Sequence, residues 1–324
     1  MASDDVIQAE PLTLVATPAK GSVSALLMRP EQARWLLVFG HGAGAGMRHR
    51  FMEAISARLA ALGIATLRYQ FPYMEAGSRR PDARAALLAT VRAAVAAARF
   101  AAPDLPLLAG GKSMGGRMTS LAAAEAALPG VRGIVFVGFP LHPAGRPSTE
   151  RADHLERVDL PLLFLQGERD QLGGLDLLRP LCARLGTRAT LHVIPTADHG
   201  FHVLKSSGRT DGDVLYELAR TVAAWAATLG QDRRDVEGGN RIDAQDRAAV
   251  GHVESRRCQR PHVGAVRLIE QDRQIPEDRA RVGDLGDAHA RADHLDRPLD
   301  HHEKLAGDGA ASQHEVAGLV NLDR

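Results

Sequence analysis

The sequence predicts an α/β fold over residues 1–230, built on a mostly parallel, doubly wound sheet of about eight strands. Three observations support this prediction. Short runs rich in leucine and β-branched residues alternate with longer helical patterns. Several of these runs are apolar throughout, as expected for parallel strands covered on both faces. All 13 Phe, Trp and Tyr residues lie before Gly230, so the large side chains that build a core are confined to this part.

The strands are predicted, in chain order, at residues 12–16, 23–28, 35–39, 65–69, 107–110, 133–137, 162–166 and 190–194. The helices are predicted at residues 49–62, 81–100, 116–127, 175–185 and 213–229. Pro81 suits a first helical turn, and Gly63 and Gly186 suit helix ends. We expect the first two strands to form an antiparallel hairpin at one edge, because no helical pattern separates them.

Residues 231–324 form a tail of different composition. The tail has no aromatic residue and carries 15 Lys plus Arg against 19 Asp plus Glu. Without large apolar side chains it cannot bury enough surface to offset the entropy of ordering, so we predict that it is mostly disordered, with short frayed helices as its only regular structure. Its composition also resembles translation of a GC-rich gene in a shifted frame, a hypothesis that sequencing the transcript around codon 231 tests.

Composition narrows the class of protein. The net charge of +1 gives no bulk electrostatic reason to bind nucleic acid or a membrane surface. No apolar run approaches the roughly 20 residues that cross a bilayer, and the acidic N-terminus does not look like a secretory signal. The two cysteines, Cys182 and Cys258, do not suggest a disulfide framework. We therefore expect a cytoplasmic protein, and the sequence leaves its oligomeric state open.

The strongest motif is Gly-Lys-Ser-Met-Gly-Gly at residues 111–116, between a predicted strand and a predicted helix. A Gly-x-Ser-x-Gly pattern in this context is typical of a nucleophile elbow, which exposes the serine Oγ on a strained turn. Ser113 is therefore the candidate nucleophile. Lys112 and Arg117 flank it; a solvated position is the simpler interpretation of both, and a preference for an anionic substrate is the alternative.

A serine hydroxyl needs a base to take its proton and an acid to orient that base. In folds with this elbow the acid and the histidine follow the serine in the chain. Asp170 follows the predicted strand 162–166 and is the candidate acid, with Glu168 as the alternative. His199 follows the last predicted strand and is the candidate base. We interpret the neighbouring Asp198 as a loop-capping carboxylate.

Two backbone N–H groups are needed to bind the developing oxyanion. One is expected from Met114, directly after the serine. The other is expected from Ala43, with Gly44 as the alternative, in the glycine-rich run that follows the predicted strand 35–39. His41 in the same run is interpreted as a residue that orients the loop.

Competing motifs fit less well. A Walker A loop would need a glycine where Pro106 stands, and the glycine-rich run at residues 40–46 lacks the spacing of a dinucleotide-binding motif. The histidines at 199 and 202 have no cysteines or paired carboxylates beside them, so we predict neither a metal nor another cofactor.

Several segments together resemble one branch of the α/β-hydrolase superfamily. These are residues 40–46, 71–74, 111–118, 138–143, 165–170 and 198–203, in that order. The branch is similar to dienelactone hydrolases and resembles testis-expressed protein thirty and the hydrolase-like domain of the third NSL-complex subunit. The resemblance covers residues 12–229. It implies an α/β-hydrolase fold and a triad of Ser113, Asp170 and His199, but it brings no defined substrate.

These residues together predict a serine hydrolase that cleaves a small ester, thioester or lactone through an acyl-enzyme. Residues 138–161 are too few for a large lid, so we expect an open site. Phe71, Tyr73, Phe139 and Phe201 are candidates for lining it, with Met74 and Leu141; core packing is the alternative for each. The alternative function is an enzyme-derived interaction scaffold with little or no catalysis.

Overall fold

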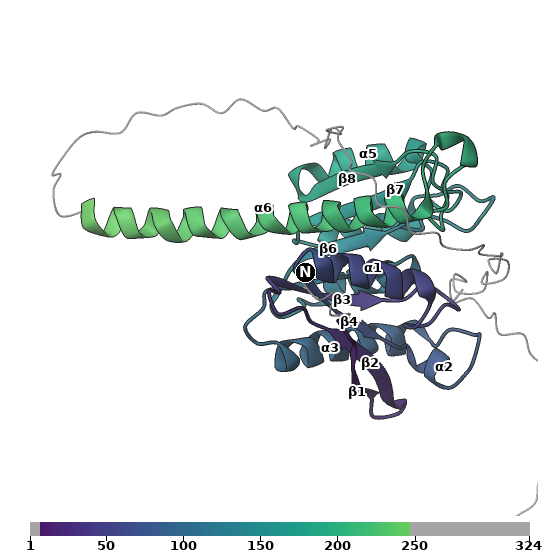
Figure 1. The fold of residues 1–324 in the computed structure, drawn as a ribbon, viewed down its shortest axis with the longest axis horizontal. Helices are drawn as coiled ribbons and strands as arrows, with labels where there is room; N and C mark the ends of the chain where they lie inside the picture. The colour runs from purple at the N-terminus through teal and green to yellow at the C-terminus, as the bar shows by residue number, and fades with distance from the viewer. Residues whose placement is uncertain (1–6, 247–324) are drawn as a thin grey trace, which may run out of the picture. The chain divides into compact units, whose positions relative to one another are not determined.

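The structure is a computed structural model that describes residues 7–246. Its eight strands form one sheet in the order β1-β2-β4-β3-β5-β6-β7-β8 (Figure 1). β1 pairs antiparallel with β2 and β2 antiparallel with β4, whereas all other neighbours are parallel. This confirms the predicted hairpin edge and the mostly parallel sheet. The strands are β1 Glu10–Thr17, β2 Gly21–Met28, β3 Trp35–Gly40, β4 Ile64–Tyr69, β5 Leu107–Lys112, β6 Val131–Val137, β7 Leu162–Gly167 and β8 Ala189–Ile194.

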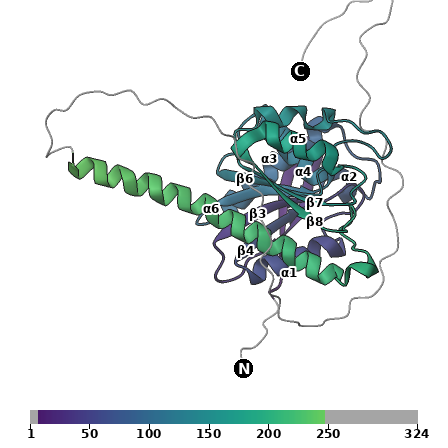
Figure 2. The same ribbon diagram turned by 90° about the horizontal axis from the view of Figure 1, so that it is seen from above.

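Helices cover both faces of the sheet (Figure 2). α1 and α6 pack on one face, and α3, α4 and α5 pack on the other. Every residue of β3, β4 and β7 is buried, as expected for strands covered on both faces, although β4 and β7 include the polar residues Thr66, Arg68 and Gln166. The helices are α1 Arg50–Ala61, α2 Pro72–Glu75, α3 Arg84–Ala101, α4 Met114–Glu125, α5 Leu175–Leu185 and α6 Asp211–Asp246, with 3₁₀ turns η1 Glu150–Arg157, η2 Gly186–Arg188 and η3 Lys205–Ser207.

One predicted helix start was wrong. α3 begins at Arg84, so Pro81 precedes the helix and does not occupy its first turn. The reason is a long-range contact of the next residue, since the buried carboxylate of Asp82 accepts a hydrogen bond from the Tyr73 N–H at 2.7 Å. The same carboxylate forms an ion pair with Lys20 at 2.6 Å. These two contacts hold the segment before α3 as a loop against α2 and the turn between β1 and β2.

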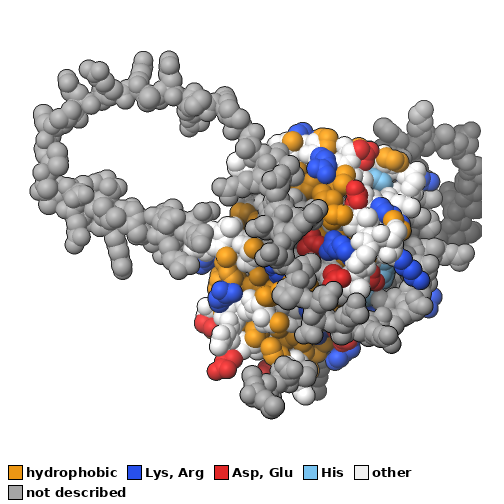
Figure 3. All heavy atoms as spheres, turned by 45° about the horizontal axis from the view of Figure 1, so that its top comes forward, with side chains coloured by type: hydrophobic (Ala, Val, Ile, Leu, Met, Phe, Trp, Pro, Cys, Tyr) orange, Lys and Arg blue, Asp and Glu red, His pale blue; other side chains and the backbone are white. Residues whose placement is uncertain are grey.

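The last helix was also predicted too short. α6 continues past residue 229 to Asp246, into the segment expected to be disordered. The rest of the predicted tail, residues 247–324, lies outside the described residues, as does Cys258. None of the helices within residues 7–246 is both long enough and apolar enough to cross a bilayer. Figure 3 shows basic and acidic side chains interspersed with apolar ones on one face, in keeping with the net charge of +1.

Candidate active site

The turn from β5 into α4 has the geometry of a nucleophile elbow. Ser113 lies between the two elements with φ 50° and ψ −114°, a strained conformation for a residue with a Cβ atom. Its own N–H donates to the Val137 carbonyl on the neighbouring strand at 3.1 Å. The turn is therefore anchored to β6, and the first turn of α4 begins directly after the serine.

Glycines around the elbow allow two backbones to cross closely. A Cβ atom on Gly115 would lie 2.3 Å from the Gly40 carbonyl oxygen, and one on Gly111 would lie 2.5 Å from the same atom. Real Cβ atoms do not tolerate such distances from the backbone. The loop that follows β3 is thereby pressed against the start of α4, next to Ser113.

The structure brings the three candidate triad residues together. His199 Nε2 lies 2.9 Å from Ser113 Oγ, and His199 Nδ1 lies 2.7 Å from Asp170 Oδ2. Because the carboxylate accepts the Nδ1 proton, the neutral ring presents Nε2 as an acceptor for the serine proton. The alternative acid, Glu168, points elsewhere and accepts from the Thr196 N–H at 2.8 Å. The geometry thus separates the two carboxylates that the sequence left open.

Gln166, near the end of β7, holds Asp170 in place. Its Nε2 donates to Asp170 Oδ2 at 2.8 Å and to the Gly173 carbonyl at 3.0 Å. Its Oε1 accepts from the Phe139 N–H at 2.9 Å. The other Asp170 oxygen accepts from the Leu172 N–H at 2.8 Å. Sequence reasoning missed Gln166. The signal in the sequence was an amide side chain in an otherwise apolar strand, and the structure shows that this amide is fully buried.

The glycine-rich run after β3 lies beside the serine. A Cβ atom on Gly42 would lie 3.8 Å from Ser113 Cβ. The Gly44 N–H donates to the Tyr73 hydroxyl at 3.1 Å, and the Ala45 N–H donates to the Gly42 carbonyl at 3.2 Å. Within the part of the chain that the structure describes, no acceptor is paired with the Ala43 N–H. The Ala43 N–H is therefore available as a donor, and its role in binding an oxyanion stays a prediction.

His41 orients this loop. The ring is fully buried, with Nδ1 at 2.7 Å from the Gly42 carbonyl, while Nε2 accepts from the Phe71 N–H at 3.2 Å. These partners fix the neutral tautomer with the proton on Nδ1. Burial lowers the pKa of His41 to about 4, with a smaller opposing effect of its hydrogen bond to Gly42. The neutral ring therefore connects the Gly42 carbonyl to the Phe71 N–H and orients the loop, as predicted from the sequence.

Comparison with known proteins identifies the family. The alpha/beta hydrolase domain family matches residues 33–227, which span the sheet from before β3 to within α6. The chain belongs to the alpha/beta hydrolase family. The predicted family is thereby confirmed, and the likeness to dienelactone hydrolases is borne out at the level of the fold by a solved structure described below. The likeness to testis-expressed protein thirty stays a prediction.

A curated relative shares part of its length with this chain. A Mycobacterium tuberculosis protein named "Putative phosphoribosyl transferase" is 31% identical over 231 residues, covering 69% of this hydrolase-family chain. The aligned region is 47% of that protein, so the chain spans about half the length of this relative. The name therefore describes a protein about half of which lies outside the alignment.

Solved structures share the fold of this alpha/beta hydrolase. A serine hydrolase without a lid from Xanthomonas campestris is 23% identical, with a TM-score of 0.53 over 67% of this chain and 95% of its own. A dienelactone hydrolase from Anabaena variabilis is 20% identical, with a TM-score of 0.54 over 67% of this chain and 97% of its own. An alpha-beta serine hydrolase homologue from Coxiella burnetii is 18% identical, with a TM-score of 0.54 over 67% of this chain and 98% of its own. At these identities the likeness concerns the fold.

The four aromatic residues expected to line the substrate site of this hydrolase are buried. Phe71 and Phe139 have no exposed surface, and Phe201 and Tyr73 expose 2% and 3% of theirs. Phe139 packs edge-to-face on Phe136 with ring centroids 4.9 Å apart. Leu141 is fully buried as well, whereas Met74 is partly exposed. Core packing, the alternative interpretation, therefore describes these four side chains, because apolar rings on the carboxyl-end loops are drawn into the layers beside the sheet.

Lys112 was expected to face solvent, but the residue is only partly exposed. Its Nζ donates to the His199 carbonyl at 2.7 Å and lies over the rings of Phe51 and Phe201. His202, beyond that ring, pairs with Asp211 at 2.6 Å. Within the described residues, no group of three or more His, Cys, Asp or Glu side chains could hold a metal ion.

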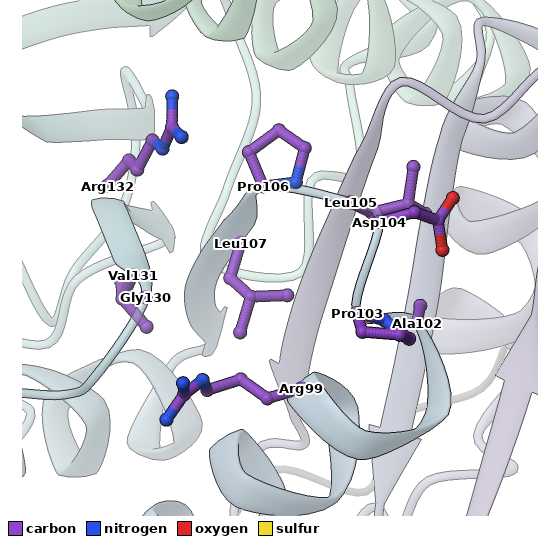
Figure 4. Close-up of a pocket in the computed structure, with 10 residues that line it drawn as sticks. All are labelled: Arg99, Ala102, Pro103, Asp104, Leu105, Pro106, Leu107, Gly130, Val131 and Arg132. Atoms are coloured by element: carbon purple, nitrogen blue, oxygen red, sulfur yellow. The ribbon is translucent and has the colours of Figure 1, made fainter.

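A hollow of about 500 Å³ lies at the amino ends of the parallel strands β5 and β6 (Figure 4). Its lining comes from the end of α3 and from the starts of β5 and β6, including Arg99, Asp104 and Arg132. Ser113 stands at the other end of β5, so this hollow is separate from the candidate active site. In Figure 4 the Arg99 and Arg132 side chains point in different directions, and Asp104 pairs with Arg29 at 2.7 Å.

Proposed function

We propose that this alpha/beta hydrolase cleaves a small ester, thioester or lactone through an acyl-enzyme on Ser113. The observation that carries the proposal is the continuous chain from Ser113 Oγ to His199 at 2.9 Å and from His199 to Asp170 at 2.7 Å. Asp170 has a fully buried side chain, and His199 is 16% exposed. A buried acid and an accessible base are the arrangement that nucleophilic catalysis by a serine requires.

In the proposed mechanism, His199 Nε2 takes the Ser113 proton as Oγ attacks the carbonyl carbon. The Met114 and Ala43 N–H groups bind the oxyanion. Met114 is the first residue of α4, so its N–H has no acceptor within the helix. The imidazolium, stabilised by Asp170, gives its proton to the leaving group. Water, deprotonated by the same ring, then releases the acid and restores Ser113.

A small or solvent-accessible substrate suits the loops around the site. Between β6 and β7, residues 138–161 contain only the 3₁₀ turn η1 as regular structure. A lid of several helices cannot be built from this segment. The Xanthomonas campestris structure with the same fold is described as lacking a lid. We therefore propose an open site that accepts short acyl groups and needs neither a metal nor another cofactor.

The test is hydrolysis of p-nitrophenyl acetate by the full chain, together with labelling by a fluorophosphonate probe. Ser113→Ala should abolish labelling and lower kcat by about 10⁴-fold or more, because the nucleophile is lost. Ser22→Ala, at an exposed serine on β2, is the matched control and should leave both unchanged. Unchanged turnover in Ser113→Ala would exclude this nucleophile.

An interaction scaffold derived from an enzyme is the alternative function. In that case the wild-type chain would stay unlabelled by the probe although it is folded. Phosphoribosyl transfer is not proposed, because the alignment covers only 47% of the relative with that name.

We further propose a cytoplasmic protein with a small-molecule substrate and with neither nucleic acid nor a membrane as partner. The net charge of +1 and the use of only two cysteines support this. Cys182 is buried without a disulfide bond, and burial raises the pKa of its thiol to about 12, so it stays protonated at neutral pH.

A further inference from the structure

Lys112 connects the strand that carries the nucleophile to the loop that carries the base. It is the last residue of β5, directly before Ser113, and its side chain extends toward the face covered by α1 and α6. There its Nζ donates a hydrogen bond to the His199 carbonyl oxygen at 2.7 Å. The two catalytic segments are thus joined by a contact between residues 87 positions apart in the chain.

The surroundings of the ammonium group are mostly apolar. Nζ lies 5.9 Å from the ring centroid of Phe51 on α1 and 5.4 Å from that of Phe201. The two rings stack on each other, with centroids 5.9 Å apart. On the other side, a Cβ atom on Gly138 would lie 3.3 Å from Nζ and 3.4 Å from Cε1 of the His199 ring. The ammonium and the imidazole are therefore separated by less than about 7 Å.

The charged and titratable groups that face Lys112 are Asp170, Asp198 and His199, while α1 presents the Phe51 ring. Burial lowers the pKa of Lys112 to about 8, and the two carboxylates partly oppose this shift. Lys112 therefore carries its positive charge at and below neutral pH. At this distance, that charge disfavours a second positive charge on the imidazole.

We propose that Lys112 is a positioning residue that fixes the His199 loop by its hydrogen bond and keeps the imidazole neutral to lower pH by its charge. The proposal rests on the proposed function, in which neutral His199 is the base. A neutral base at lower pH extends the range over which Ser113 can be activated. Asp170, by contrast, favours the charged ring, so the two neighbours act on His199 in opposite directions.

The first test is the titration of His199, which does not depend on activity. Ring resonances of the full chain are followed by NMR from pH 4 to 8, with His199→Gln used to assign the signal. Lys112→Met keeps the length of the side chain and removes the charge, so the midpoint of the His199 titration should rise by about one pH unit. Lys205→Met, the same change at an exposed lysine in η3, should leave the midpoint unchanged.

Lys112→Gln is the second variant in case Lys112→Met does not fold, and it should shift the midpoint in the same direction. An unchanged midpoint in a folded variant overturns the proposal. Failure of the proposed function is seen separately, because a wild-type chain that resists the fluorophosphonate probe can still show the shift. If the chain is an active esterase, the acid limb of its kcat/KM profile should move up with the NMR midpoint. Its kcat should also fall about tenfold at pH 7, with little change in KM, because the base is less well placed.

Discussion

Gln166→Glu tests how the candidate acid is held. The substitution keeps the shape of the side chain and the acceptor for the Phe139 N–H, but it replaces the donating NH₂ by an oxygen. That oxygen would face Asp170 Oδ2, now 2.8 Å away, and the Gly173 carbonyl, now 3.0 Å away. Both contacts change from attraction to repulsion inside a site that water does not reach.

The expected loss of stability follows from these contacts. Each hydrogen bond lost from a buried partner costs about 1–3 kcal/mol. Two carboxylates this close cannot both be ionised, so one of them must hold a proton above its usual pKa. At pH 8 we expect Gln166→Glu to lower the free energy of unfolding by about 3–5 kcal/mol. Gln166→Met, the matched control, removes the same donors without adding a charge and should cost about 2–4 kcal/mol.

Urea unfolding of both variants and the wild type at pH 5 and pH 8 separates charge from lost hydrogen bonding. The added carboxyl has a higher pKa in the folded chain than in the unfolded chain, where it is about 4.3. Its cost is therefore small below that value and grows as the pH rises toward the folded pKa. The gap between Gln166→Glu and wild type should be smaller at pH 5 than at pH 8 by about 1–3 kcal/mol, whereas the Gln166→Met gap should stay constant. A gap for Gln166→Glu that is the same at both pH values would refute this account of the site.

Three further predictions concern other contacts. His41 has a pKa lowered from 6.5 to about 4, so as the pH falls the unfolded chain binds this proton before the folded chain does. In urea unfolding, the free energy of unfolding should therefore fall by about 3 kcal/mol from this residue as the pH is lowered from 6.5 to about 4. A flat profile would contradict a buried, neutral His41. Gly115→Ala should prevent native folding or lower the free energy of unfolding by more than about 3 kcal/mol in thermal unfolding, because its Cβ would lie 2.3 Å from the Gly40 carbonyl oxygen. The control, Gly212→Ala, has its nearest contact at 3.5 Å and should be within about 0.5 kcal/mol of wild type. Lys112 has a pKa lowered from 10.5 to about 8. As the pH rises from about 8 to 10.5, the free energy of unfolding in urea should therefore increase for the wild type by up to about 3 kcal/mol relative to Lys112→Met. A constant difference would show that the ammonium group is not desolvated.

The strands were predictable because a strand that is buried on both faces consists mostly of consecutive apolar residues. β7, for example, was expected at residues 162–166 and spans Leu162–Gly167, with every residue buried. Helix ends were less predictable, because they depend on contacts distant in sequence. Pro81 has the right chemistry for a first helical turn, but the ion pair and hydrogen bond of Asp82 hold that segment outside α3. The partners of Asp82, the Tyr73 N–H and Lys20, are distant in sequence and cannot be predicted from the residues around Pro81.

The candidate triad was predictable for a related reason. Parallel strands end at the same edge of the sheet, so polar residues that follow β5, β7 and β8 must approach one another there. Chain order and strand ends were enough to select Ser113 and His199. They were not enough to choose between Asp170 and Glu168, which are two positions apart. That choice depends on which carboxylate turns toward the imidazole, and the Gln166 amide fixes Asp170 in that direction.

The positions of aromatic side chains on the loops after these strands could not be predicted from the sequence. A phenylalanine near an active site in sequence can point into the site or into the layer of helices beside the sheet, and the pattern of residues is the same. Phe201 shows the difference, because the backbone at this residue has φ 68° and its ring stacks on Phe51 under the loop. That placement brings the ring beneath the ammonium of Lys112, 5.4 Å away. The residue expected to contact a substrate instead helps to form the surroundings of a buried charge.

Gln166 and Lys112 have one feature in common that explains why the sequence did not point to Gln166 and why Lys112 was interpreted as solvated. Each lies at the end of a strand that leads to a candidate catalytic residue, where a polar side chain is normally interpreted as the start of a solvated loop. The sheet places them between layers instead, because the loops after β6 and β8 cover the ends of β5 and β7. A polar group covered in this way must find partners, and the available ones are Asp170 and the His199 carbonyl. The need to satisfy these buried groups therefore orients the acid and the base, so the precision of the candidate site follows from the same burial that stabilises the sheet.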